Sequence, residues 1–174
     1  LTPCILELGG KCPTVVDVGC NMDYSAAKIC MATFLNAGQT CVRPDYVLVH
    51  ESLQDEFVAT MNKHIARMEL EGDDKNQLGR IVTEWHTGRC EDLLAKHGGK
   101  VLCGGKVNKQ KKYCAPTMIL NPSEDSLIMQ EEIFAPILAV MTYKNFDEVI
   151  TYINTKDKPL AVYYYGPRGS KNSQ

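Results

Sequence analysis

Three short stretches of the 174-residue chain carry side chains that could do chemistry. In NAGQTC, Cys41 follows a helix-like run that stops at Gly38 and precedes a valine-rich segment, so its thiol is expected in a turn. In LELGGK, Glu7 lies between two leucines, and the glycines that follow let a ligand approach the backbone. In MQEEIFAPILAV, Glu131 and Glu132 precede an apolar run. A thiol and carboxylates are the groups used in nucleophilic and general acid–base catalysis.

The same side chains have ordinary structural interpretations, which the local sequence leaves open. Free cysteines are most often small core residues. Cys41 also follows the C-terminal end of a predicted helix, where the helix dipole disfavours a thiolate. Glu7 could equally end a strand and face solvent before a tight turn, and the acids before Ile133 could simply be solvated. No single stretch decides between structure and catalysis.

Alternating strands and helices must position these residues. Short apolar runs rich in β-branched residues predict strands, and capped runs with helical periodicity predict helices. The predicted strands are 3–8, 14–18, 46–49, 101–103, 117–120, 137–143 and 161–165, and the predicted helices are 22–36, 83–97, 146–154 and a run from a capping box at 52–55 to 68. This alternation favours an α/β fold of three layers, a mostly parallel sheet with helices on both faces. The basic stretch 106–112 is expected to be a solvated surface loop.

Composition narrows the function classes. The chain has 44% hydrophobic residues, enough for one domain or two small ones, and its net charge of −2 gives no electrostatic reason to expect a nucleic-acid partner. The longest apolar stretch, 133–141, is too short to span a bilayer. His86 and Cys90 would share a helix face, but no second ligand pair follows, so we expect no metal site. The eight cysteines are scattered without a Cys-x-x-Cys pair, which favours a reducing, cytoplasmic setting.

Taken together, the three stretches resemble the aldehyde dehydrogenase superfamily, and most of all its class 3 and fatty aldehyde dehydrogenase branch. LELGGK, NAGQTC and MQEEIFAP carry the resemblance, and GQTCVRPDYVL, LGRIV, YCAPTMIL and DKPLAVYYY extend it. It covers residues 1–165, and the combination is specific although each piece alone is not. One departure is Ala135, where the family usually has glycine, and its methyl group is expected to crowd the nicotinamide side slightly.

The resemblance implies an NAD- or NADP-dependent oxidoreductase that converts aldehydes to carboxylic acids. Cys41 would be the nucleophile that attacks the aldehyde carbonyl to give a thiohemiacetal, which loses hydride to the nicotinamide and becomes a thioester. Glu7 would activate the water that hydrolyses this thioester, and would help to deprotonate Cys41 through a water. The backbone N–H of Cys41 would form part of the oxyanion hole.

The resemblance also implies a set of coenzyme contacts and partners. Glu132 would hold the hydroxyls of the nicotinamide ribose, and Phe134 would lie beside the nicotinamide. Leu8 and Gly9 would lie against its ring. The substrate would be a medium- or long-chain aliphatic aldehyde or an aromatic one, and the full-length protein would be a homodimer.

On the same resemblance, residues 1–165 correspond to the catalytic domain, followed by a polar tail at 166–174. The family's coenzyme-binding domain and C-terminal segment have no counterpart in this sequence, so the isolated chain is expected to be inactive as a dehydrogenase. Two alternatives remain open. One is a non-catalytic fragment or assembly module that retains the fold, and the other is a coenzyme-independent esterase in which Cys41 attacks activated esters.

Overall fold

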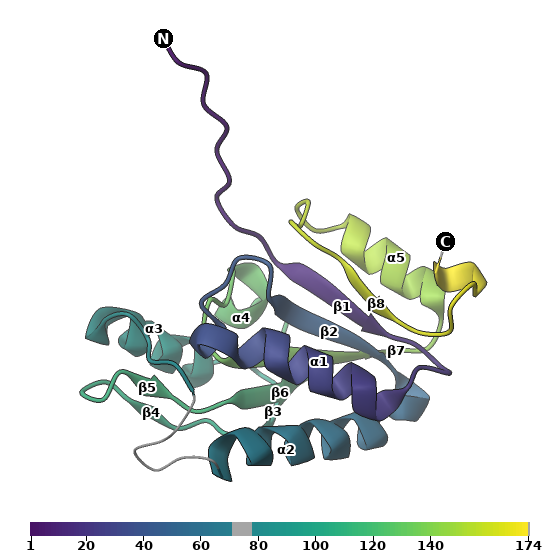
Figure 1. The fold of residues 1–174 in the computed structure, drawn as a ribbon, viewed down its shortest axis with the longest axis horizontal. Coiled ribbons are helices and arrows are strands. Elements are labelled where there is room, and N and C mark those ends of the chain that lie inside the picture. The colour runs from purple at the N-terminus through teal and green to yellow at the C-terminus, as the bar shows by residue number, and fades with distance from the viewer. Residues whose placement is uncertain (71–77, 174) are drawn as a thin grey trace.

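A six-stranded sheet forms the centre of the computed structural model, which describes residues 1–70 and 78–173 (Figure 1). The order of the strands across the sheet is β3, β6, β7, β2, β1, β8. Their bounds are β1 Cys12–Val16, β2 Pro44–His50, β3 Lys100–Cys103, β6 Thr117–Leu120, β7 Ile137–Tyr143 and β8 Tyr163–Tyr165. Neighbouring strands are parallel except β3 and β6, which are antiparallel.

Helices cover both faces of this sheet (Figure 1). The helices α1 Met22–Phe34 and α2 Gln54–Leu70 lie on one face, and α3 Glu84–Ala95, α4 Leu127–Gln130 and α5 Phe146–Asn154 lie on the other. In β2, Val47 and Val49 join the core formed with α1 and α2, whereas Tyr46 and Leu48 join the opposite core. Successive strand side chains point to opposite faces, so a strand between two helical layers must be apolar throughout. The predicted three-layer α/β fold is confirmed.

The helix boundaries follow from capping side chains. Asn21 Oδ1 accepts a hydrogen bond from the backbone N–H of Tyr24 at 3.1 Å, and Thr83 Oγ1 accepts one from His86 N–H at 3.1 Å. Each bond satisfies a backbone donor that the first turn of a helix leaves unpaired. α5 has the predicted bounds, whereas α1 ends at Phe34, two residues earlier than predicted. No helix in the described ranges is long and apolar enough to cross a lipid bilayer.

The predicted strand 3–8 is wrong. These residues belong to an irregular N-terminal segment that leads away from the sheet (Figure 1), and Ile5, Leu6 and Leu8 are largely exposed. A strand needs a neighbour for its backbone N–H and C=O groups. Within the described part of the chain no strand pairs with 3–8, so an apolar run alone did not make a strand there.

A small hairpin lies where the sequence predicts a surface loop. β4 Val107–Asn108 pairs antiparallel with β5 Tyr113–Cys114. Its tip at 108–112 is exposed, as expected, but Val107 and Cys114 pack into the core that also contains α3. The loop was predicted from its basic residues, and the two apolar positions that anchor the hairpin, Val107 and Cys114, were not recognised.

One buried carboxylate, that of Asp17 at the end of β1, fastens residues 166–173 to the sheet. Asp17 accepts hydrogen bonds from Tyr164 Oη at 2.8 Å, Asn172 Nδ2 at 2.8 Å and Tyr143 Oη at 3.0 Å. Burial alone raises the pKa of Asp17, but the hydrogen bonds from Asn172 and Tyr164, with others, outweigh burial and hold this pKa below its ordinary value. The predicted polar tail is thus attached to the sheet by an ionised side chain.

Replacing Asp17 with Asn should weaken this attachment, because an amide NH₂ would then face hydroxyl and amide donors. We expect a loss of about 1–3 kcal/mol in the free energy of unfolding at pH 7, the usual cost of leaving buried polar groups unpaired. The pKa of Asp17 in the folded protein lies below the unfolded value of ~3.9. The extra free energy of unfolding of the wild type should therefore disappear as the pH falls through the folded pKa of Asp17. Urea denaturation at several pH values measures both effects, and a difference that does not depend on pH would contradict this role for Asp17.

Candidate active site

The three chemical stretches meet at one edge of the sheet because each leads into a parallel strand. Gly9 lies just before β1, Cys41 just before β2, and Phe134 just before β7. These three strands run in the same direction, in the order β7, β2, β1. Their first residues therefore lie at the same edge, and the candidate site occupies the amino ends of the parallel strands.

The turn that carries Cys41 is built from backbone that most residues avoid. Asn36, Ala37 and Gly38 have φ values of 53°, 55° and 70°, which is the left-handed region. At Gly38 a Cβ atom would come within 2.2 Å of the carbonyl oxygen of Ala135, so only glycine fits. This contact brings the Cys41 turn against the segment that carries Phe134.

Gln39 fixes the same turn from the other side. Its Nε2 donates to the carbonyl oxygens of Asn36 at 2.9 Å and Arg80 at 3.0 Å, and its Oε1 accepts from Val82 N–H at 3.0 Å. Three bonds from one side chain replace the regular backbone pairing that a left-handed turn lacks. The turn is thereby attached to residues 80–82, which precede α3.

Cys41 itself is half-buried beside the starts of β1 and β8. The Cys12 thiol donates to the Cys41 carbonyl oxygen with a sulfur–oxygen distance of 3.6 Å, and Tyr163 Oη donates to the carbonyl oxygen of Val42 at 2.6 Å. Burial raises the pKa of the Cys12 thiol, so this group stays protonated and able to donate. The backbone that follows the Cys41 side chain is therefore held in place, as Gln39 holds the backbone that precedes it.

Glu132 lies directly against the glycines of the LELGGK stretch. Gly9 has a φ of 102°, and a Cβ atom there would come within 2.3 Å of Glu132 Oε2. Leu8, Gly9 and Glu132 line one cleft of about 540 Å³ with residues 155–158. Burial raises the pKa of the Glu132 carboxyl, and a hydrogen bond from the backbone of Gly10 offsets part of that rise. Its Oε1 is buried without a hydrogen-bond partner.

Phe134 is held in a backbone conformation that bulky side chains rarely adopt. Its φ is 46°, and the residue is 43% exposed. The ring lines a pocket of about 260 Å³ that is also lined by Gln39, Trp85 and Ala135. Left-handed bulky residues store strain and cluster at functional sites. The predicted coenzyme residue Phe134 is thus adjacent to the turn that holds Cys41.

Glu7 is less closely integrated than the other predicted residues. It is exposed in the N-terminal segment, and its Oε1 accepts a hydrogen bond from Gly9 N–H at 2.9 Å. Its charge is close enough to help raise the pKa of Glu132. Among the described residues no hydrogen bond joins Glu7 to Cys41. The structure brings Leu8, Gly9 and Glu132 together, and Phe134 to the Cys41 turn, but leaves Glu7 at the open margin.

A charged network that the sequence did not predict lies beneath the site. Asp45 is 1% exposed, and its two carboxylate oxygens accept from Ile133 N–H at 3.1 and 3.2 Å. Lys11 Nζ lies 3.1 Å from Asp45, and Arg43 Nη1 lies 3.9 Å from it. Burial lowers the pKa of the Lys11 ammonium, and Asp45 offsets part of this effect. The sequence signal that could have predicted this network is the presence of charged residues directly beside an apolar strand. Residues at such positions are rarely exposed to water on both faces of the chain, so their charges usually need partners within the protein.

Arg43 and Lys11 of this network, together with Arg89, hold the segment 128–137. Arg43 donates to the carbonyl oxygens of Ala135 at 3.0 Å and Ile137 at 2.6 Å. Arg89 donates to the carbonyl oxygens of Ile133 at 2.7 Å and Glu132 at 2.8 Å. Lys11 donates to those of Ile128 at 2.7 Å and Glu131 at 2.8 Å. The side chains of Glu132 and Phe134 are therefore presented by backbone that charged donors fix in place.

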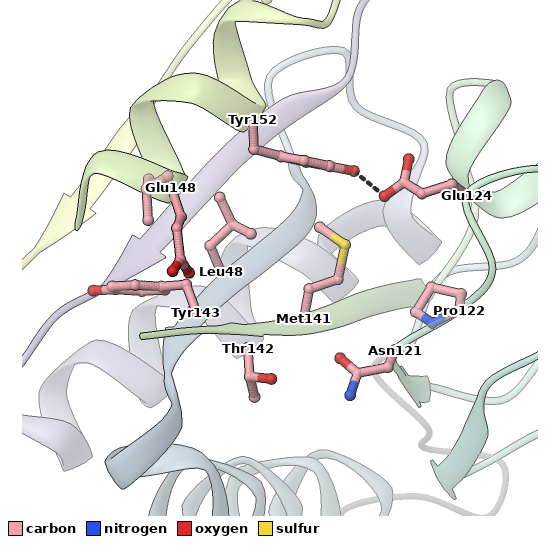
Figure 2. A pocket seen from close by; sticks show the side chains of 10 residues that line it. Leu48, Asn121, Pro122, Glu124, Met141, Thr142, Tyr143, Glu148 and Tyr152 are labelled. Atoms are coloured by element: carbon pink, nitrogen blue, oxygen red, sulfur yellow. Dashed lines mark hydrogen bonds between the residues drawn. The ribbon is translucent and has the colours of Figure 1, made fainter. Parts of the chain in front are cut away.

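A separate cavity of about 310 Å³ lies between α5 and β7 (Figure 2). Leu48 and Met141 line it, and Figure 2 shows the hydrogen bond from Tyr152 to Glu124. The distance from Tyr152 Oη to Glu124 Oε1 is 2.6 Å. None of the predicted site residues lines this cavity. No group of histidines, cysteines and carboxylates able to hold a metal ion occurs among the residues that the structure describes. The candidate site is therefore the edge formed by the starts of β1, β2 and β7.

Comparison with known proteins points to one family. A model described as the aldehyde dehydrogenase family matches residues 1–171. The chain is 41% identical over 168 residues to 4,4'-diaponeurosporen-aldehyde dehydrogenase of Staphylococcus aureus, covering 95% of this chain and 36% of that protein. It is 39% identical over 168 residues to the dimeric NADP-preferring aldehyde dehydrogenase of Mus musculus, again covering 95% of this chain and 36% of the relative.

A solved structure, the substrate-bound state of AldH from Staphylococcus aureus, superimposes with a TM-score of 0.90 at 37% identity. The match covers 97% of this chain and 37% of that one. The chain thus spans about a third of the length of the relatives it matches.

Replacing Asp45 with Asn should lower the free energy of unfolding by disrupting the charged network that supports the site. Breaking a buried ion pair by removing one partner commonly costs about 3–5 kcal/mol, because Arg43 and Lys11 would keep buried charges without a counter-ion. Asp92 is exposed on α3, so Asp92→Asn is a matched control that should stay within about 0.5 kcal/mol of wild type. Urea denaturation compares the variants, and equal stabilities for the two would show that the network does not hold the fold.

Proposed function

The chain belongs to the aldehyde dehydrogenase family, and on that basis we propose that it supplies the catalytic domain, residues 1–165, of an enzyme that oxidises aldehydes to carboxylic acids with NAD or NADP. The observation that carries the proposal is the meeting of the three motifs at one sheet edge. Gly9 abuts Glu132, and the Cys41 turn abuts the segment that carries Phe134. A family resemblance in sequence does not by itself require such contacts.

Cys41 is the proposed nucleophile. Its thiolate attacks the aldehyde carbonyl carbon, forms a carbon–sulfur bond and yields a thiohemiacetal. The backbone N–H of Cys41 stabilises the oxyanion that develops on the former carbonyl oxygen. Because Gln39 and Gly38 fix the turn, the thiol needs little reorganisation to reach its substrate, which is the advantage of a pre-positioned nucleophile.

Glu7 is the proposed general base. It takes a proton from the water that attacks the thioester carbon, and breaking the carbon–sulfur bond releases the carboxylic acid and regenerates Cys41. The exposed position of Glu7 suits this role, since its carboxylate can exchange protons with solvent. Its present hydrogen bond to Gly9 N–H would be given up when it turns toward the substrate.

The residues of the cleft fit a nicotinamide coenzyme. Glu132 Oε1 is a buried acceptor without a partner, as expected for a group that receives ribose hydroxyls. Because Gly9 has no Cβ, the Glu132 carboxylate can lie directly against its backbone, and Leu8 in the cleft and Phe134 in the pocket beside Gln39 offer apolar surface to an aromatic ring. When bound, the nicotinamide accepts the hydride that converts a thiohemiacetal into a thioester.

We extend the proposal to substrate and assembly. Medium- or long-chain aliphatic aldehydes, or aromatic ones, are the proposed substrates, in line with the class 3 resemblance. The mouse relative is named as a dimeric, NADP-preferring enzyme, and a homodimer is accordingly proposed for the full-length protein. A non-catalytic assembly module is the second candidate, favoured by the exposed Leu1, Ile5 and Leu6, which would need a covering surface.

Acylation of Cys41 distinguishes the two candidates without a coenzyme. With p-nitrophenyl acetate the chain should release a first, rapid equivalent of p-nitrophenol as one acetyl group is added to Cys41, located by peptide mapping, and then release more at the rate of deacetylation. Cys4 is exposed in the N-terminal segment, so the test uses a Cys4→Ser background, and Cys41→Ser in that background is the control. Glu7→Gln should slow release of the acetyl group by about a hundredfold or more, the usual effect of losing a general base. Acetylation spread over the other cysteines would favour the assembly module.

The isolated 174-residue chain should bind NAD and NADP weakly or not at all. Glu132 and Phe134 touch only the nicotinamide end, so the adenosine and pyrophosphate would find no partner among the proposed contacts. Losing contacts of several kcal/mol lowers affinity by tenfold for each ~1.4 kcal/mol, which moves binding to the millimolar range or weaker. Titration calorimetry measures this directly, and a low-micromolar dissociation constant would overturn the proposed division of the coenzyme site.

A further inference from the structure

Two of the eight cysteines lie side by side where helix α3 packs against the β4–β5 hairpin. Cys90 is on α3, Cys114 is the last residue of β5, and both belong to the same apolar core. Their thiols are in hydrogen-bonding contact. Neither thiol takes part in the chemistry proposed for Cys41 and Glu7, so this pair calls for an explanation of its own.

We propose that Cys90 and Cys114 form a site of reversible oxidation, at which a hydroperoxide converts the two thiols into one intramolecular disulfide. Two thiol sulfur atoms that are already in contact need only small rotations about their Cα–Cβ bonds to reach the S–S bond length of about 2.05 Å. Where thiols are kept reduced, disulfides are mostly transient and redox-sensing. The pair is accordingly a modification site and not a permanent cross-link.

The pocket beside Phe134 gives a small oxidant a route to one of the two thiols. Both cysteines are buried, but Cys90 is among the residues that line this pocket of about 260 Å³, whereas Cys114 is not. Hydrogen peroxide is little larger than a water molecule, which takes up about 30 Å³ of liquid volume. An oxidant of that size fits the pocket and meets Cys90 first.

The two thiols differ in reactivity, because the thiolate and not the thiol attacks a peroxide. The hydrogen bond from Cys114 lowers the pKa of the Cys90 thiol, and the positive charge of Arg89 acts in the same direction, against burial and the charge of Glu91. For Cys114 the same hydrogen bond and burial both raise the pKa, so this thiol stays protonated. Cys90 is therefore the attacking residue, and Cys114 is the resolving one.

The oxidation proceeds in two balanced steps. The Cys90 thiolate attacks one oxygen of hydrogen peroxide, a sulfur–oxygen bond forms, the oxygen–oxygen bond breaks, and hydroxide leaves and takes up the proton that Cys90 had lost. The product is a sulfenic acid. The sulfur of Cys114 then attacks that of Cys90, the sulfur–sulfur bond forms, the sulfur–oxygen bond breaks, and the departing hydroxide takes the Cys114 proton to become water. Two thiols and one peroxide thus give one disulfide and two waters.

The disulfide joins two supports of the proposed active site. Helix α3 carries Arg89, which donates to the carbonyl oxygen of Glu132 at 2.8 Å. The hairpin accepts a hydrogen bond from Ile81 N–H at 2.9 Å, next to the residues that Gln39 connects to the Cys41 turn. The oxidation is a property of the two thiols and does not rest on the proposed function, which supplies only this consequence.

The test is a titration of the folded 174-residue chain with hydrogen peroxide, followed by alkylation of the remaining thiols in denaturant and non-reducing peptide mapping. The expected product is a pair of peptides that contain Cys90 and Cys114, have lost two hydrogen atoms and separate when dithiothreitol is added. Cys30 is an internal control. It is equally buried, but burial raises its pKa to about 12, and its sulfur contacts the thioether of Met68 at 3.4 Å. It should therefore be recovered as an alkylated thiol.

Two serine variants separate the roles of the two thiols. In Cys114→Ser, Cys90 should stop at the sulfenic acid, which dimedone traps, whereas in Cys90→Ser the Cys114 thiol should survive. The wild-type map decides alone if either variant fails to fold. Recovery of both residues as alkylated thiols up to the peroxide concentration that unfolds the chain would overturn the proposal, and so would a disulfide between either of them and another cysteine as the main product.

Discussion

The buried carboxylate of Asp45 is the interaction on which the rest of the site depends. The segment from Glu131 to Pro136 has no regular helix or strand, so it lacks the continuous ladder of backbone hydrogen bonds that a strand or helix makes, although the Pro136 carbonyl oxygen accepts from Thr117 N–H of β6. Irregular buried backbone is costly unless side chains supply its partners. Asp45 supplies an acceptor, and Arg43, Lys11 and Arg89 supply donors. Arg43 and Lys11 tolerate burial because Asp45 balances them, and Arg89 pairs with Glu131. The segment tolerates irregularity because these three cations hold it.

The location of the site is unusual for a parallel sheet. In open α/β sheets, ligands generally bind outside the carboxyl ends of the strands. Here Gly9, Cys41 and Phe134 all precede their strands, which places them at the amino ends. Loops before strands are anchored by the strands they enter, and the side chains of Arg43 and Asp45 begin that anchoring at the start of β2. The turn that carries Cys41 is consequently connected to the centre of the sheet.

Much of the fold could be predicted from sequence because apolar runs and caps are local signals. Strands β2 and β7 and helix α5 follow from such signals, and Asn21 and Thr83 start their helices as capping residues should. The strand predicted at 3–8 failed because pairing depends on a neighbour that the run itself cannot specify. The motif residues were found through the family resemblance, whereas Arg43 and Asp45 were not, because their partners lie about ninety positions away. Long-range pairing of charge with backbone leaves no local pattern.

The contact between Gly38 and Ala135 has a consequence for how such a site can change over generations. Backbone atoms of two separate loops lie so close that a Cβ at position 38 would overlap the carbonyl oxygen of residue 135. A side chain at 38 would displace the loop that presents Phe134, and a shift of that loop would press on the turn that presents Cys41. Neither loop can change its conformation without the other. Substitutions that alter the surface proposed for the aldehyde therefore also alter the surface proposed for the coenzyme. Diversification of this site is therefore confined to residues outside that contact.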